Sequence, residues 1–242
     1  MAQNDVVVAG LGEVGTPLFD LIAEKHPAIG IDIEPATPTS ECAVLHICYP
    51  FSSSFVETTV QYIRDYRPAL TIINATVAPG TTRAVHKIAK TPIAYSPVRG
   101  KHHKMKQDLL NYVKFVGGID RDSAAHAEGH FQSIGMQTRV VNSPETAELA
   151  KLTETTYFGL LIAWAQEVSR YCERWNADYG EVASFYDEIP FLPRVRYTPG
   201  VIGGHCVMPN IDILKKIIES DLLDAIISSN KTQMHKGLRA VV

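Results

Sequence analysis

The hydrophobic pattern of the first half alternates short apolar runs with amphipathic segments. Residues 6–9, 29–31 and 43–48 are apolar runs typical of strands that are buried on both faces. Apolar residues spaced three and four apart predict helices over residues 16–25, 55–66, 81–89 and 123–134. Further short strands are predicted at residues 70–74, 93–94, 115–116 and 138–141. This alternation predicts an α/β fold with a Rossmann-like, doubly wound parallel sheet.

The connection after the second predicted strand is short. Residues 34–40 form a proline-rich polar loop, and the next apolar run begins at residue 43. A crossover helix needs about a dozen residues, so none fits here. We therefore expect the sheet to be trimmed after its second strand.

The second half opens with a strong helix start at Ser143-Pro144-Glu145. No Gly or Pro break follows until about Asn176, apart from the isolated Gly159. This predicts a helix of roughly 30 residues, about 45 Å long. We expect two domains: residues 1–142 bind a dinucleotide, and residues 143–242 form a helical domain with this helix as its stem.

Apolar side chains on the predicted long helix spread over more than one face, which favours burial against several neighbours, including a second copy of the chain. We therefore expect a homodimer. Shorter helices are predicted at residues 178–185, with a capping box through Glu181, and from residue 211 to about 233, with Asn210 as the cap.

Composition narrows the class of protein. The chain has 242 residues, a net charge of −3 and 45% apolar residues, so no overall positive field favours nucleic acid or an anionic membrane. No apolar run reaches the roughly 18 residues that span a bilayer. The four cysteines show neither CxxC pairing nor zinc spacing, and we expect no metal site and a reduced, cytoplasmic setting.

The first predicted strand leads into a complete GxGxxG, Gly10-Leu11-Gly12-Glu13-Val14-Gly15. In a dinucleotide-binding turn, Gly10 makes the tight turn, Gly12 lets the backbone approach a pyrophosphate, and Gly15 lets the helix pack on the strand. The pattern of strand, glycines, helix, strand and acid at the N-terminus makes a glycine-rich turn without a ligand the weaker alternative.

Asp32 closes the second predicted strand, 17 residues after Gly15. A carboxylate there can accept a hydrogen bond from a ribose 2′-hydroxyl and would repel a 2′-phosphate. The cofactor that we predict is therefore NAD rather than NADP.

Two further loops follow predicted strands, where ligands bind in such sheets. One is Ala75-Thr76-Val77-Ala78-Pro79-Gly80-Thr81-Thr82. The other, residues 96–104, is basic and contains Arg99 and His102; it is either an anion site or a solvated charged surface.

A glycine-rich loop near the C-terminus ends in Gly203-Gly204-His205-Cys206 and precedes a helical pattern. A thiol just before a helix N-terminus is favoured as the reactive thiolate. Alternatively, Cys206 is a small buried residue beside a turn. Lys151 and Thr155 stand four apart on the long helix, and such a lysine is either solvated or part of a site that also includes Cys206.

These motifs, in this order, resemble the nucleotide-sugar (UDP-glucose/GDP-mannose) dehydrogenase family, most closely its UDP-N-acetylmannosaminuronate-type branch. The matching segments are the glycine fingerprint, Ile47-Cys48-Tyr49-Pro50, residues 75–82, Ser96-Pro97-x-Arg99, Val116-Gly117-Gly118, Glu148-Leu149-Ala150-Lys151-Leu152 and Gly203-Gly204-His205-Cys206. The likeness covers nearly the whole chain. We expect the chain to lack the family's third domain.

The resemblance implies an NAD-dependent oxidation of a sugar C6 alcohol to a carboxylate, in polysaccharide biosynthesis. Cys206 would be the nucleophile, Lys151 would stabilise an oxyanion, and Thr76 would lie near the nicotinamide and the reacting water. Tyr49 and Pro50 would line the cofactor site. Residues expected to contact the substrate are Arg99, Thr155, Gly203, Gly204 and His205.

Three departures from the family pattern affect the expected chemistry. Val98 replaces the carboxylate that helps to activate water, Thr155 replaces an asparagine, and Asn210 replaces an aspartate. His102 is a candidate substitute base. Three hypotheses follow: a nucleotide-sugar dehydrogenase impaired in thioester hydrolysis, a non-catalytic NAD-binding relative, and an enzyme similar to β-hydroxyacid dehydrogenases.

Overall fold

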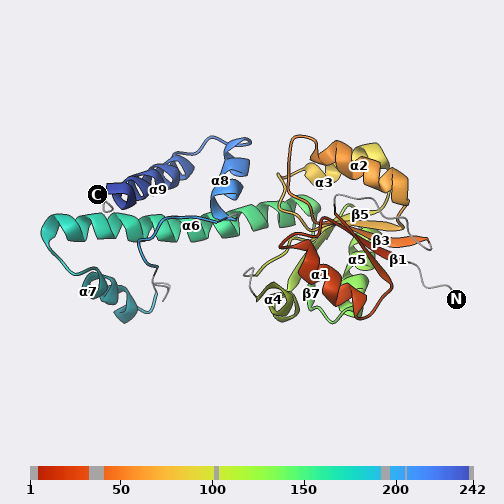
Figure 1. The fold of residues 1–242 in the computed structure, drawn as a ribbon, viewed down its shortest axis with the longest axis horizontal. Coiled ribbons are helices and arrows are strands. Elements are labelled where there is room, and N and C mark those ends of the chain that lie inside the picture. Colours follow the sequence, from red (N-terminus) through yellow and green to blue (C-terminus); the bar gives the residue numbers. More distant parts are fainter. Residues whose placement is uncertain (1–4, 33–40, 101–103, 192–196, 205, 240–242) are drawn as a thin grey trace. The chain divides into compact units, whose positions relative to one another are not determined.

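The computed structural model describes residues 5–32, 41–100, 104–191, 197–204 and 206–239 (Figure 1). The chain forms two compact units, Met1–Lys151 and Leu152–Val242. The expected division into residues 1–142 and 143–242 stays a prediction. Among the helices of the described ranges, none is long and apolar enough to cross a membrane.

The first unit is built on a seven-stranded, mostly parallel sheet, which confirms the predicted α/β class. Its strands lie in the order β2-β1-β3-β4-β5-β6-β7. Their bounds are β1 Asp5–Ala9, β2 Ala28–Ile31, β3 Cys42–Ile47, β4 Leu70–Ile73, β5 Ile93–Tyr95, β6 Lys114–Gly118 and β7 Thr138–Val141. The strand that follows β2 in the chain, β3, pairs with β1 on the side away from β2. Within the described residues the sheet therefore ends at β2, as the short connection over residues 34–40 predicts.

One part of the predicted topology is wrong. β6 runs antiparallel to β5, with Tyr95 opposite Gly117, whereas all other neighbouring strands are parallel. The connection after β5 contains α4 (Met105–Asn111), which packs beside α1 (Gly15–Ala23). Since this connection does not recross the sheet, β6 starts from the end at which β5 finishes. The seven-residue α4 is too short for sequence periodicity to reveal.

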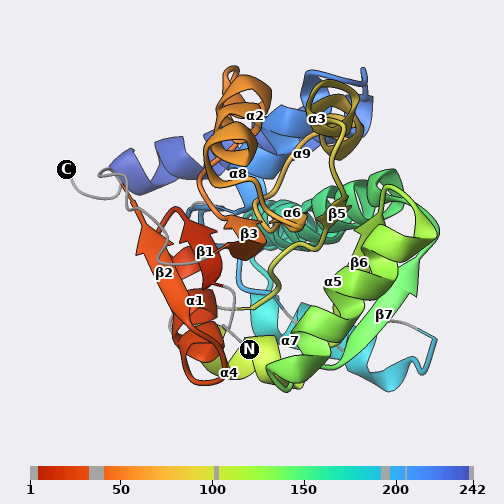
Figure 2. The same cartoon turned by 90° about the vertical axis from the view of Figure 1, so that its right-hand side faces the viewer.

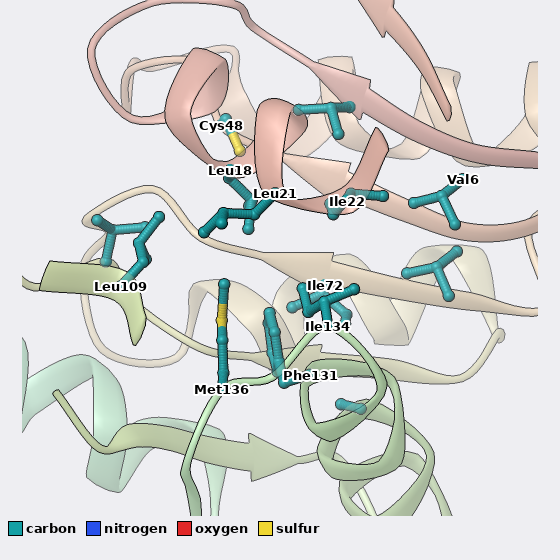
Figure 3. Packing of buried hydrophobic residues seen from close by; sticks show 14 of the residues in the cluster. Val6, Leu18, Leu21, Ile22, Cys48, Ile72, Leu109, Phe131, Ile134 and Met136 are labelled. Carbon is teal, nitrogen blue, oxygen red and sulfur yellow. The ribbon is translucent and has the colours of Figure 1, made fainter. Parts of the chain in front are cut away.

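Alternate residues of each strand enter two separate cores. Helices α1, α4 and α5 (Arg121–Ser133) cover one face, where Leu18, Leu109 and Phe131 pack on strand residues such as Val6 and Ile72 (Figure 3). Helices α2 (Phe55–Tyr66) and α3 (Thr81–Ala89) and the start of α6 cover the other face, as Figure 2 shows. This is the doubly wound arrangement that the continuous apolar runs predict.

The second unit is helical. Its elements are α6 (Pro144–Trp175, which begins in the first unit), α7 (Tyr179–Ser184), a 3₁₀ turn at Phe185–Glu188, α8 (Val207–Lys215) and α9 (Asp221–Arg239). Its core joins Leu152 and Ala163 of α6 to Ile211 of α8 and Ile226 of α9.

The long helix α6 begins and ends where its sequence predicts. The Ser143 hydroxyl accepts from the Thr146 N–H at 3.2 Å, which caps the first turn. Asn176 adopts a left-handed φ of 51°, and the Ala177 N–H closes the last turn on the Cys172 carbonyl at 2.9 Å. One of the two hydrogen bonds of the predicted capping box of α7 is formed: the Asp178 carboxylate accepts from the Glu181 N–H at 2.8 Å.

The isolated Gly159 in α6 has a packing reason. A Cβ built on Gly159 would lie 2.7 Å from Cγ1 of Val207 and 3.5 Å from Cδ1 of Ile211, so α6 and α8 approach closely at this point. By contrast, a Cβ built on the exposed Gly129 of α5 would have no heavy atom within 4 Å.

These two glycines predict opposite effects of the same substitution. Gly129→Ala should stabilise the protein by about 0.5–1 kcal/mol, because alanine loses less backbone entropy in a helix. Gly159→Ala should destabilise it, because one of the two helices must shift. Thermal and denaturant unfolding of both variants measures this, and a stabilised Gly159→Ala would contradict the close approach.

Two buried histidines lie between the sheet and α5. Asn74 Nδ2 lies 3.0 Å from His46 Nδ1 and donates to the Ile72 carbonyl at 3.1 Å. Because an amide nitrogen only donates, His46 carries its proton on Nε2, which donates to His130 Nε2 at 2.9 Å. Burial is the main effect that lowers the pKa of both rings, for His130 to about 4.

This pair predicts acid sensitivity. The pKa of His130 is lower in the folded than in the unfolded chain. The contribution of His130 to the free energy of unfolding is therefore complete above about pH 6.5 and is lost as pH falls towards 4. The expected loss is on the order of 3 kcal/mol for His130. His130→Gln should flatten this part of the curve of unfolding free energy against pH, whereas the exposed His235→Gln should not. An unchanged slope in His130→Gln would refute the assignment.

Candidate active site

The loop between β1 and α1 is a tight turn that requires glycine at two positions. Gly10 has a φ of 93°, and a Cβ built on it would lie 2.6 Å from the backbone nitrogen of Tyr49. A Cβ on Gly15 would lie 1.7 Å from the Gly10 carbonyl oxygen. The turn is therefore closed against the end of β3, and α1 begins directly on it.

Gly12 has the opposite surroundings. A Cβ there would have no heavy atom within 4 Å, so bare backbone faces open space just before the N-terminus of α1. Of the other turn residues, Leu11 packs against Gly30 of β2, Glu13 is exposed, and Val14 is the N-cap residue of α1. The residues present fit a dinucleotide, whose pyrophosphate would meet the Gly12 backbone and the helix N-terminus.

Residues on both sides of this turn lie at the same edge of the sheet. β2 and β3 flank β1 in parallel, so Asp32 follows β2 on one side and Tyr49 and Pro50 follow β3 on the other. Asp32 is exposed. Tyr49 is half-buried, with its hydroxyl 2.6 Å from Thr59 Oγ1, and burial raises the pKa of Tyr49.

The loop that carries Thr76 is held by a buried carboxylate from α6. Glu148 has no exposed surface. Its Oε2 accepts from the Gly80 N–H at 2.6 Å, and its Oε1 accepts from the Thr82 N–H at 2.9 Å and the Thr82 hydroxyl at 2.7 Å. Burial raises the pKa of Glu148, and these hydrogen bonds oppose the rise. The carboxylate therefore occupies the N-terminus of α3, where the helix dipole favours a negative charge.

Two lysines lie in this part of the first unit. Lys151 follows Glu148 by three residues on α6 and is half-buried. Lys114 of β6 is buried, and its Nζ donates to the carbonyl oxygens of Ser96 at 2.9 Å and Pro97 at 3.1 Å. Burial lowers the pKa of Lys114 to about 7, and the positive charge of Lys151 adds to this effect. Lys114 thus fixes the turn that precedes Val98.

The side chain at position 98 belongs to the core. Val98 is 5% exposed and packs in the same apolar cluster as Cys48 and Met105. A carboxylate at this position would be surrounded by apolar side chains. The next residue, Arg99, is half-buried and lies with its guanidinium carbon 5.5 Å from the centre of the Phe115 ring.

The cysteine loop leads into its helix earlier than predicted. α8 begins at Val207, with half-buried Cys206 as its N-cap residue, so the expected start at residue 211 with Asn210 as the cap is wrong. Pro209 does not prevent this, because the N–H that proline lacks would have no partner in the first turn. Cys206 is therefore closer to the helix N-terminus than the sequence suggested.

Two positions that depart from the family pattern contact each other. Asn210 Nδ2 donates to Thr155 Oγ1 at 2.8 Å, and the Thr155 hydroxyl in turn donates to the Leu152 carbonyl at 3.0 Å. The hydroxyl proton of Thr155 is thus donated within α6. The pair is neutral and contains no carboxylate.

The predicted site residues fall into two groups. The glycine turn, Thr76, Arg99 and Lys151 lie in the first unit, whereas Thr155, Cys206, Gly203 and Gly204 lie in the second. Gly203 and Gly204 are exposed, and Gly204 has a φ of 78°. The predicted His102 and His205 lie outside the described residues. Within the described ranges, no three His, Cys, Asp or Glu side chains are grouped as metal ligands.

Sequence reasoning missed the residues that hold these loops. Glu148 lies in the segment Glu148–Leu152 that matches the family pattern, and this match was the signal that could have found it. Lys114, which precedes the predicted strand at residues 115–116, and Gln166 and Asn230, which lie in predicted helices, are buried polar residues. Their burial depends on tertiary contacts, so no local pattern could have revealed them.

Part of the chain is similar to a known family of dehydrogenases. Residues 145–234 match the model of the UDP-glucose/GDP-mannose dehydrogenase family, central domain. A UDP-N-acetyl-D-mannosamine dehydrogenase from Methanococcus maripaludis is 24% identical, over 84% of this chain and 59% of that protein. The chain therefore spans about three fifths of the length of this relative.

Solved structures show the same fold. The structure of a UDP-D-ManNAc dehydrogenase from Pyrococcus horikoshii matches with a TM-score of 0.82 at 21% identity, over 95% of this chain and 68% of that one. A 3-hydroxyisobutyrate dehydrogenase from Mycobacterium tuberculosis matches with a TM-score of 0.75 at 17% identity, over 95% of this chain and 94% of that one.

Proposed function

Because this chain is related to the UDP-glucose/GDP-mannose dehydrogenase family, we propose that it is an NAD-dependent oxidoreductase that acts on a CH–OH group. The observation that carries the proposal is the glycine turn, closed at Gly10 and Gly15 and open at Gly12, with the exposed Asp32 at the same sheet edge. NAD, when bound, supplies the hydride acceptor.

We propose a sugar nucleotide as the substrate class, oxidised at its C6 alcohol. The Methanococcus maripaludis relative, a UDP-N-acetyl-D-mannosamine dehydrogenase, supports this choice. Arg99 and the Gly203-Gly204 backbone would contact the substrate.

In this mechanism the Cys206 thiolate adds to the carbonyl carbon of the aldehyde that the first oxidation leaves. The Lys151 ammonium stabilises the negative charge that forms on the oxygen. Loss of a second hydride, to a second NAD, would then leave a thioester on Cys206, which water would hydrolyse to a carboxylic acid and the free thiol. Thr76 would orient that water.

Among the described residues, positions 98, 155 and 210 offer the last step no carboxylate as its base. Val98 is apolar and buried, and Asn210 and Thr155 are neutral and bonded to each other. General-base help typically contributes about 10²–10⁴-fold, so thioester hydrolysis should be slow. These same observations favour a second candidate, a relative that binds NAD without catalysis, and the experiments below separate the two.

The cofactor choice is tested by titration calorimetry. NAD should bind more tightly than NADP, because the Asp32 carboxylate repels a 2′-phosphate. Asp32→Ala should narrow the difference, whereas the exposed Asp122→Ala on α5 should not. Equal affinity for the two cofactors, or no binding of either, would refute the proposed dinucleotide site.

The nucleophile is tested by mass spectrometry of the protein after incubation with NAD and sugar nucleotides. An adduct should accumulate on Cys206, because its hydrolysis is slow. Cys206→Ser should abolish the adduct and leave NAD affinity unchanged. Asn210→Asp, which adds a carboxylate beside Thr155, should speed release of the adduct. If no sugar nucleotide yields NADH and Cys206 reacts with iodoacetamide no faster than the buried Cys172, the non-catalytic relative is the better account.

We also propose a homodimer through α6. Four exposed aromatic side chains recur along one face of this helix: Tyr157, Trp164, Tyr171 and Trp175. Light scattering at micromolar concentration should give twice the mass of the chain, and Trp164→Glu should shift it towards the monomer. Ile88→Glu, at an exposed apolar position on α3, is the matched control. A wild-type monomer would refute the proposal.

A further inference from the structure

The loop before Cys206 is paired to α9 through its backbone. The Ile202 N–H donates to Asn230 Oδ1 at 2.7 Å, and Asn230 Nδ2 donates to the Ile202 carbonyl at 3.0 Å. Both residues are 3% exposed. Asn230 therefore binds one loop residue at both of its backbone groups, as a neighbouring strand would.

Gln166 of α6 supports this pairing. It is fully buried, and its Nε2 donates to the Gly200 carbonyl at 2.7 Å and lies 3.4 Å from Asn230 Oδ1. Its Oε1 accepts from the Ser229 hydroxyl at 2.8 Å, which fixes the orientation of the amide.

A third amide completes the hold on the loop, since Gln233 Nε2 donates to the Pro199 carbonyl at 2.6 Å. The loop contains Gly200, Gly203 and Gly204, which have no side chain to bury. The side chain of Ile202 packs in the core of the second unit, whereas at the glycines the position of the loop depends on recognition of its backbone.

The chain after Cys206 is fixed as well. Asn210 is bonded to Thr155 of α6, so Cys206 lies four residues after the anchored Ile202 and four residues before the anchored Asn210. All of these contacts lie within the second unit. The backbone is thus anchored within this unit at a residue before Cys206 and at a residue after it.

We propose that Asn230, supported by Gln166, is a positioning residue for Cys206. It contacts no reacting atom; it holds the loop that leads to Cys206, the N-cap residue of α8, and the N-terminus of a helix in general favours a negative charge. This inference rests on the proposed role of Cys206 as the nucleophile.

The test is the rate of Cys206 alkylation by iodoacetamide between pH 6 and 10, followed by mass spectrometry of the full chain. Each profile is normalised to its plateau, so that a change in access does not affect the midpoint. Asn230→Leu removes both bonds to Ile202 and should raise the midpoint by about one pH unit, which lowers the rate at pH 7, relative to the plateau, about tenfold. Asn230→Asp keeps the acceptor and loses the donor, so a smaller shift is expected.

Leu223→Ala is the matched control, because Leu223 is buried on α9 in the core of the second unit and is not an amide that holds the loop. It should lower the melting temperature and leave the midpoint unchanged. Superimposable profiles for wild type and both Asn230 variants would overturn the proposal, and so would an equal shift in Leu223→Ala. Since alkylation needs neither NAD nor a sugar nucleotide, a protein without dehydrogenase activity still gives an answer.

Discussion

The buried carboxylate of Glu148 is the interaction on which the first unit's candidate site depends. Desolvation of a carboxylate is costly, and here three donors from Gly80 and Thr82 offset that cost. Loss of the carboxylate would leave two buried backbone N–H groups without a partner, at about 1–3 kcal/mol each. The same bonds fix the start of α6 against the Thr76 loop, and Lys151 lies less than one helical turn further along.

Lys114 performs the corresponding task for the next loop, as a hydrogen-bond donor to backbone carbonyls rather than an acceptor from backbone N–H groups. A buried ammonium is stable only if its protons are accepted, and the carbonyls of Ser96 and Pro97 do this. The ring of Phe131, 4.8 Å away, adds a favourable contact. Both loops at this sheet edge are therefore held by ionisable side chains that bind backbone groups, in addition to the packing of buried loop residues such as Val77 and Val98.

The sequence predicted the elements whose signals are local. Helices α2 and α3 have the predicted bounds, and Ser143 and Asn176 mark the ends of α6 as expected. The reversal of β6 was not predictable from periodicity, because a strand pattern carries no direction. The start of α8 was misplaced because Pro209 reads as a break, although a proline costs little in a first turn.

The candidate site was predictable only as a set of motifs. The glycine turn, the Thr76 loop and the Cys206 loop could be read from the sequence, since each is marked by glycine or proline. What holds them could not be read, because Glu148, Lys114 and Asn230 acquire their roles from residues far away in the chain.

The buried amides of the second unit bind backbone groups of the glycine-rich loop. Apolar residues at positions 166 and 230 would leave the Ile202 N–H and the carbonyls of Ile202 and Gly200 without these partners, at about 1–3 kcal/mol each. These amides therefore contribute to stability, and they also hold the loop that leads to Cys206. The departures at Val98, Thr155 and Asn210 remove a base and leave this loop held in place. If Cys206 is the nucleophile, as we propose, the chain keeps the contacts that hold its loop and has no carboxylate at positions 98, 155 and 210, so the proposed reaction would be limited by its last step.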